Sequence, residues 1–197
     1  MIALAERILE QARERPEGTP LFARELLRLG SRAAVDQALS RLVKLGQLLR
    51  AGRGIYVRPV ETRFGVRPPS VPTVLENLAA VKGETVVPHG AAAANALGLT
   101  TQVPVRTVYL TSGRSRRLSL GAQSIELRHA PPWQLVLPKG RAGQAIRALA
   151  WFGRERAKEA VQSLRGKLSE TELTELASAQ GRLPTWVAMQ VSALAHG

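Results

Sequence analysis

The sequence has no cysteine, only one aspartate and few aromatic residues, and each shortage excludes a class of site. Without cysteine there is no disulfide, no thiolate metal site and no cysteine nucleophile. The single aspartate, Asp36, leaves little from which to build a metal-dependent phosphoryl-transfer site, because such sites need several carboxylates. We therefore expect a protein without a metal, a cofactor or a catalytic residue.

Long apolar runs are also missing from the sequence. No segment approaches the ~18 consecutive apolar residues that indicate a membrane-spanning helix, and the first residues lack the pattern of a secretory signal peptide. Apolar residues still make up 45% of the chain, which is enough to form a core. We expect a soluble, cytoplasmic protein that does not bind a membrane.

Basic residues outnumber acidic ones by 28 to 15, which gives a net charge of +13. The excess is uneven along the chain: it is +5 over residues 1–60, +7 over residues 61–150 and +1 over residues 151–197. A positive charge of this size favours a polyanion such as nucleic acid, or an acidic protein, as the partner.

A proline-rich stretch predicts two domains. Residues 59–72 contain four prolines and one glycine, a density typical of an extended, semi-rigid linker. The sequence thus predicts one domain over residues 1–58, a linker over residues 59–72 and a second domain over residues 73–197.

The first domain has the pattern of a winged helix-turn-helix. Apolar residues recur at helical spacing over residues 3–15, from Thr19-Pro20 to residue 29, and from Ser31 to residue 45. The turn between the second and third helices is short and contains Gly30, as this motif requires. Residues 47–57 then alternate around Gly52-Arg53-Gly54, which indicates a hairpin that would form the wing.

The third helix and the hairpin carry polar groups suited to DNA. A helix fits the major groove, where its exposed side chains can bond to phosphates and base edges, and its N-terminus favours a phosphate. The alternatives are a merely solvated face and a protein-binding module. The residues predicted to contact DNA are Ser31, Arg32, Gln37, Arg41, Lys44, Arg50 and Arg53.

Residues 73–197 predict an α+β domain with a small antiparallel sheet and a helical C-terminus. The expected strands cover residues 84–88, 106–111, 118–120 and 124–129, the last three as a meander, and the expected helices cover residues 73–81, 91–97, 141–152, 154–165, 170–180 and 184–195. The whole chain is therefore expected to be α+β, with an N-terminal winged helix-turn-helix.

A second group of arginines lies on or beside these strands: Arg106, Arg114, Arg116, Arg117 and Arg128. Few acidic residues balance them, so the segment could attract an acidic protein or hold RNA or DNA. A solubilising loop is the other reading. His89 precedes an expected helix, but no Asp, Cys or second His lies near it in sequence, which favours a turn or core histidine over a catalytic one.

Several motifs resemble the AbiEi-like antitoxins of type IV toxin–antitoxin systems. In the first domain they are Leu39-Ser40-Arg41-Leu42 and Arg53-Gly54-Ile55-Tyr56-Val57. In the second domain they are Val86-Val87-Pro88-His89-Gly90, Ala94-Asn95-Ala96-Leu97-Gly98-Leu99 and Thr107-Val108-Tyr109-Leu110-Thr111-Ser112-Gly113. The similarity spans nearly the whole chain.

The resemblance implies a non-enzymatic antitoxin. Its winged helix would bind repeats in its own promoter and repress the operon, with two copies of the protein on an inverted repeat. Its second domain would neutralise a cognate nucleotidyltransferase-like toxin, and the second group of arginines would form the antitoxic surface. Two alternatives stay open: a regulator whose second domain senses a ligand and has no toxin partner, and an enzyme that acts on nucleic acid through His89.

Overall fold

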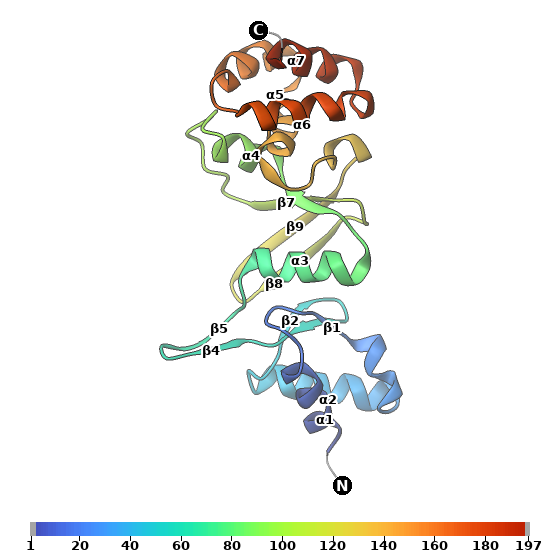
Figure 1. The fold of residues 1–197 in the computed structure, drawn as a ribbon. Coiled ribbons are helices and arrows are strands. Elements are labelled where there is room, and N and C mark those ends of the chain that lie inside the picture. Colours follow the sequence, from blue (N-terminus) through green and yellow to red (C-terminus); the bar gives the residue numbers. More distant parts are fainter. Residues whose placement is uncertain (1–2, 196–197) are drawn as a thin grey trace. The chain divides into compact units, whose positions relative to one another are not determined.

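The computed structural model describes residues 3–195 and confirms the α+β class (Figure 1). Its contacts divide the chain into two compact units. Met1–Glu84 and Arg117–Ile125 form the first unit, and Thr85–Arg116 and Glu126–Gly197 form the second. The units therefore divide the chain elsewhere than at the proline-rich stretch, and the first unit is discontinuous in sequence.

The first unit begins with a winged helix-turn-helix. Its elements are α1 (Leu4–Arg13), β1 (Leu21–Phe22), the 3-10 helix η1 (Ala23–Arg28), α2 (Arg32–Lys44), β2 (Leu49–Gly52) and β3 (Ile55–Val57). The strands form an antiparallel sheet in the order β1-β3-β2. Its core contains fully buried side chains from α1, η1, α2 and the start of the wing: Ile8, Leu26, Leu39 and Leu48.

The second helix of this motif differs from the sequence prediction, which started it at Thr19-Pro20. Leu21 and Phe22 form β1 instead, opposite Tyr56 and Ile55 of β3, and the helical turn begins only at Ala23. Both β1 side chains are buried. Pairing with β3 thus outweighs the helical spacing of these residues, as tertiary contacts often do with local propensity.

Residues 59–72 form structure of their own rather than an extended linker. β4 (Val60–Thr62) and β5 (Gly65–Arg67) pair as an antiparallel hairpin, and α3 (Val71–Lys82) starts immediately after it. The Ser70 side chain caps α3 by accepting a hydrogen bond from the backbone N–H of Thr73 at 3.2 Å. Prolines flank the two strands and occupy the first turn of α3, where a missing N–H costs little.

The last part of the first unit is the tip of a hairpin between β8 (Arg116–Leu120) and β9 (Gln123–His129). A Cβ atom on Gly52 would lie 3.2 Å from Leu118, and a Cβ atom on Gly121 would lie 2.9 Å from Pro68. The tip therefore packs against the wing and against the end of the β4–β5 hairpin.

β6 (Val86–Pro88) and β7 (Thr107–Thr111) pair antiparallel and belong to a four-stranded sheet with the order β6-β7-β9-β8. The expected meander is wrong in its order, because β9 and not β8 lies beside β7. β9 is the longest of the four strands and buries Ile125 and Leu127 completely, which suits an interior position in the sheet.

Helices complete the second unit: α4 (Gly90–Ala96), the 3-10 helix η2 (Pro132–Gln134), α5 (Gly140–Leu164), α6 (Glu170–Ala179), the 3-10 helix η3 (Gln180–Arg182) and α7 (Thr185–Ala195). Gly153, with φ 74° and ψ 175°, interrupts α5 at the predicted break between two helices. The four α-helices share one apolar core. None of the helices that the structure describes is long and apolar enough to cross a membrane.

Candidate nucleic-acid interface

The outward face of α2 is polar and open to solvent. The opposite face buries Val35, Ala38, Leu39 and Leu42 in the core. Ala34 and Val43 are half-buried, and the other positions of α2 are exposed. Asp36, Gln37, Ser40, Arg41 and Lys44 line a shallow depression on that exposed face. The structure thus brings together three of the residues predicted to contact DNA: Gln37, Arg41 and Lys44.

The N-terminus of α2 presents a polar side chain and a cation. The Ser31 hydroxyl caps the helix by accepting a hydrogen bond from the backbone N–H of Ala34 at 3.3 Å. Arg32 pairs with Asp36 one turn later, at 2.8 Å between Nε and Oδ2. Both side chains of this pair are largely exposed, so the pair is weak and a phosphate could displace the carboxylate.

The wing carries the other two predicted contacts. Arg50 is exposed on β2, opposite Tyr56 of β3. Arg53 is exposed at the turn between Gly52 and Gly54, and Gly54 has a φ of +68°, which glycine adopts without strain. All seven residues of the predicted DNA face are therefore exposed and lie in the first unit.

The predicted antitoxic arginines do not form one cluster within a single unit. Arg106 and Arg114 are exposed in the second unit, Arg116 is half-buried there, and Arg117 is exposed in the first unit. The backbone carbonyl of Arg114 accepts a hydrogen bond from Nη1 of Arg116 at 3.2 Å. The Arg116 side chain is therefore held against the backbone of the loop that carries Arg114.

The remaining member of that group, Arg128, has an acidic partner. It forms two hydrogen bonds to the Glu126 carboxylate, at 2.9 Å and 3.1 Å, and these bonds together with the charge of Glu126 raise the pKa of Arg128. Glu126 therefore offsets the positive charge of Arg128. The exposed side chains of Arg106, Arg114 and Arg117 contribute more than Arg128 to the positive potential at the surface.

His89 is a helix cap. Its Nδ1 accepts a hydrogen bond from the backbone N–H of Ala91 at 3.2 Å, at the start of α4. Partial burial lowers the pKa of His89, Arg128 lowers it further, and Glu126 raises it. A lone pair on Nδ1 is needed for this bond, so the neutral ring is the capping form. The structure thus gives His89 a role as the N-terminal cap of α4.

Sequence reasoning missed the exposed β4–β5 hairpin, because prolines at both ends suggested a linker. It also missed a pocket of about 590 Å³ in the second unit. Apolar side chains between residues 130 and 138, Trp133 among them, line most of this pocket, and polar groups from Thr85, Ser112, His129 and Arg182 reach it. These four polar residues are spread over nearly a hundred positions of the chain. No local motif could therefore indicate that they lie around one pocket.

Comparisons with known proteins give a family but no function. The profile of DUF6088, a family of unknown function, matches residues 7–175. The crystal structure of the RV2827C protein from Mycobacterium tuberculosis is similar to this chain at a TM-score of 0.49 and 16% sequence identity, over 99% of this chain and 77% of that one. No curated protein sequence matches the chain.

Proposed function

Because this chain belongs to DUF6088, whose function is unknown, its role has to be inferred from its own residues, and we propose that it is a DNA-binding antitoxin. In this proposal the winged helix represses the protein's own operon, and the second unit neutralises a cognate nucleotidyltransferase-like toxin. Catalysis and a cofactor have no part in it.

One observation carries the DNA-binding half of the proposal: a basic helix face and a basic wing are exposed in the same compact unit. Gln37 and Ser40 lie on the outward side of α2, where they can reach base edges in a major groove. Arg41 lies toward one flank of that face, and Arg53 is at the tip of the wing, so both suit contacts to phosphates.

The antitoxin half is supported by the resemblance to AbiEi-like antitoxins and by the exposure of Arg106, Arg114 and Arg117. Exposed cations steer an acidic partner toward a surface, and carboxylate-rich metal sites are common in enzymes that transfer nucleotides. An acidic surface on the toxin is therefore the expected counterpart.

A mobility-shift titration with a duplex from the region upstream of the coding sequence tests the repressor half. A single winged helix contacts few phosphates, so two copies should bind an inverted repeat. If each copy neutralises ~4–6 phosphates, the logarithm of the binding constant should fall against the logarithm of salt concentration with a slope of roughly −7 to −11. Binding that does not respond to salt contradicts the proposal.

Co-expression tests the antitoxin half. A neighbouring open reading frame for a nucleotidyltransferase-like protein should arrest growth when it is induced alone, and growth should recover when this protein is induced with it. Arrest that persists at equal expression contradicts the antitoxin role but leaves DNA binding untouched.

The pocket in the second unit favours a second candidate, a ligand-sensing regulator with no toxin partner. An apolar pocket of this size with a few converging polar groups is typical of a small-molecule site. Val136 lines the pocket and is half-buried, so Val136→Trp would reduce its volume. If a metabolite extract changes DNA affinity of the unaltered protein and not of Val136→Trp, this second candidate is favoured.

A further inference from the structure

We infer that the β4–β5 hairpin, residues 60–67, is a DNA-contacting arm whose tip side chains, Arg63 and Phe64, enter the minor groove. This inference rests on the proposed DNA binding and adds to it a second contact, outside the helix and the wing. The arm belongs to the same compact unit as both of those elements.

The tip of the arm exposes an aromatic ring that the fold does not use. Phe64 is 86% exposed, whereas every other aromatic side chain in residues 3–195 is buried or half-buried. The Arg63 guanidinium lies over the Phe64 ring, 4.6 Å from its centroid. An apolar ring and a cation are thus presented side by side at the end of a hairpin.

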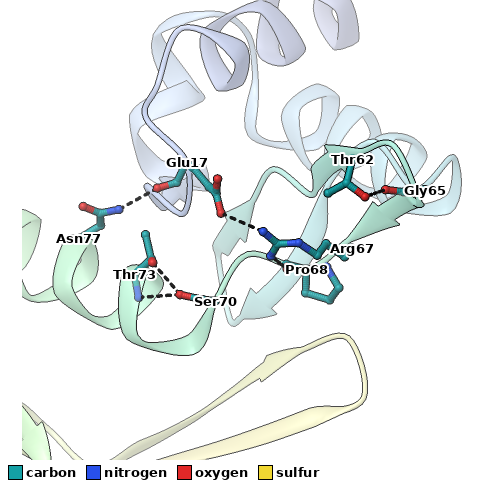
Figure 2. A network of polar contacts seen from close by, with 8 residues as sticks. All are labelled: Glu17, Thr62, Gly65, Arg67, Pro68, Ser70, Thr73 and Asn77. Carbon is teal, nitrogen blue, oxygen red and sulfur yellow. Dashed lines mark hydrogen bonds and ion pairs between the residues drawn. The ribbon is translucent and has the colours of Figure 1, made fainter.

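The turn that carries these two residues is held by hydrogen bonds of Thr62, and Figure 2 shows the one to Gly65. The Thr62 hydroxyl donates to the backbone carbonyl of Gly65 at 2.8 Å and accepts from the backbone N–H of Phe64 at 3.2 Å. Gly65 has a φ of +111°, which favours glycine at this position. The turn therefore limits the freedom of the backbone at Phe64, so that less backbone entropy is lost when the tip binds.

The base of the arm is attached to the rest of the unit (Figure 2). Nη2 of Arg67 lies 3.9 Å from the Glu17 carboxylate, and its Nη1 donates to the carbonyl of Pro68 at 3.0 Å. The side chain of Asn77 on α3 donates to the carbonyl of Glu17 at 3.0 Å. These contacts connect the arm, the loop after α1 and the middle of α3.

The size and charge of the exposed patch favour DNA over a protein partner. The large apolar side chains exposed on the arm are Phe64 and Val66, whereas a stable protein interface buries about 800 Å² on each partner. Arg63 and Arg67 against Glu61 give residues 60–67 a net charge of +1. Glu17 offsets part of the charge of Arg67 at the base of the arm, so Arg63 at the tip is the cation that suits a polyanion.

The combination at the tip matches what a minor groove accepts. Narrow minor grooves attract arginine because their negative potential is enhanced, and proteins that bind there often insert an apolar wedge such as phenylalanine between base steps. Each strand of the arm has three residues, which extend about 10 Å at ~3.3 Å per residue. That length is enough for two tip side chains to enter the groove while the strands stay outside it.

Dimethyl sulfate footprinting separates the two grooves, because the reagent methylates guanine N7 in the major groove and adenine N3 in the minor groove. The probe is a duplex from the region upstream of the coding sequence, with the full-length protein. The unaltered protein should protect guanine N7 and adenine N3 positions. Phe64→Ala should lose the adenine protection, keep the guanine protection and bind about tenfold more weakly, which corresponds to ~1.4 kcal/mol.

Two further variants complete the experiment. Phe64→Leu keeps an apolar wedge and should retain most of the adenine protection. Met189→Ala removes an exposed apolar side chain from the second unit and should bind and protect as the unaltered protein does. Circular dichroism should give the same melting curve for Phe64→Ala as for the unaltered protein, because the ring is exposed.

The outcomes distinguish failure of this inference from failure of the proposed function. If Phe64→Ala keeps full affinity and the full adenine pattern, the arm inference is overturned while DNA binding stands. If the unaltered protein protects no base, the proposed repressor function fails and the arm inference fails with it. If Phe64→Ala instead converts a dimer to a monomer in sedimentation without DNA, the arm is a self-association surface and the inference is overturned.

Discussion

A Cβ atom on Gly90 would lie 2.3 Å from the carbonyl oxygen of Arg147 and 2.6 Å from Cβ of Trp151. Gly90 starts α4, and both other residues are on α5, so these two helices approach each other more closely than any side chain at position 90 permits. The contact at Gly143 is closer still, since a Cβ atom there would lie 1.7 Å from the carbonyl oxygen of Leu137.

We expect Gly90→Ala and Gly143→Ala to lower the free energy of unfolding by about 2–3 kcal/mol or more, because the new methyl group meets backbone atoms that cannot rotate away. Urea denaturation followed by circular dichroism measures this. Gly181→Ala is the matched control, since nothing lies within 4 Å of a Cβ atom at that position. Equal midpoints for Gly90→Ala and Gly181→Ala would show that the helices can separate at little cost.

Arg147→Met should stabilise the protein. Arg147 is 1% exposed, its Nε and Nη1 have no hydrogen-bond partner among the described residues, and burial lowers its pKa to about 10. Replacing an uncompensated buried cation by an apolar side chain of similar length should raise the free energy of unfolding by about 1–3 kcal/mol.

Denaturation of Arg147→Met at neutral pH tests this expectation. Arg147→Lys keeps a charge and should show no gain. If Arg147→Met is instead less stable than the unaltered protein, the guanidinium has a compensating partner that the intramolecular contacts do not include.

The cap at His89 should make stability depend on pH. The pKa of His89 is lowered in the folded protein, mainly by burial, so the unfolded chain binds a proton more readily. The stabilising contribution is therefore fully present above the ordinary pKa of about 6.5 and is lost as the pH falls below that value. His89→Asn keeps a capping side chain that does not titrate.

Melting temperatures at pH 7.5 and pH 5.5 measure this effect. The unaltered protein should lose more stability between these two values than His89→Asn does. An identical loss in both proteins would mean that other groups cause the whole pH dependence.

Arg41→Ala with Lys44→Ala should weaken binding to the upstream duplex. If both side chains contact phosphates in each of two copies, four contacts are lost and the salt slope becomes shallower by about 3–4. Toxin neutralisation should remain. The control, Lys158→Ala with Arg165→Ala, removes the same charge from exposed positions of the second unit and should leave the slope unchanged. An equal loss of affinity in both double variants would indicate a nonspecific effect of net charge.

The triple variant Arg114→Ala, Arg116→Ala and Arg117→Ala should impair neutralisation of the toxin and spare repression. Arg128→Ala should have a smaller effect, because Glu126 already offsets its charge. Growth rescue during toxin co-expression measures the first property, and a reporter fused to the promoter measures the second. Full rescue by the triple variant would remove these arginines from the antitoxic surface.

Periodicity in the sequence was enough to predict the α-helices, although not the start of the 3-10 helix η1. The break in α5 at Gly153 and the cap at Ser31 both follow from local residue types, and the exposure of the predicted DNA face follows from the burial of the opposite stripe of α2. These features depend on neighbours within a few residues, so a single sequence contains the information.

Features that depend on distant partners were not predictable in the same way. β1 forms at Leu21 because β3 lies more than thirty residues further along the chain, and β9 lies beside β7 although β8 separates them in sequence. The pocket in the second unit also depends on residues that are distant in sequence, since Thr85 and Arg182 both line it. Local spacing has no signal for such pairings.

The return of residues 117–125 to the first unit has a consequence for how this protein can be divided. The polypeptide passes from one unit to the other three times, so no single cut releases the first unit whole. A fragment that stops at Glu84 lacks Leu118 beside Gly52 and Gly121 beside Pro68. Gene fusion or exchange of this unit between relatives would therefore have to carry two separate segments of coding sequence together.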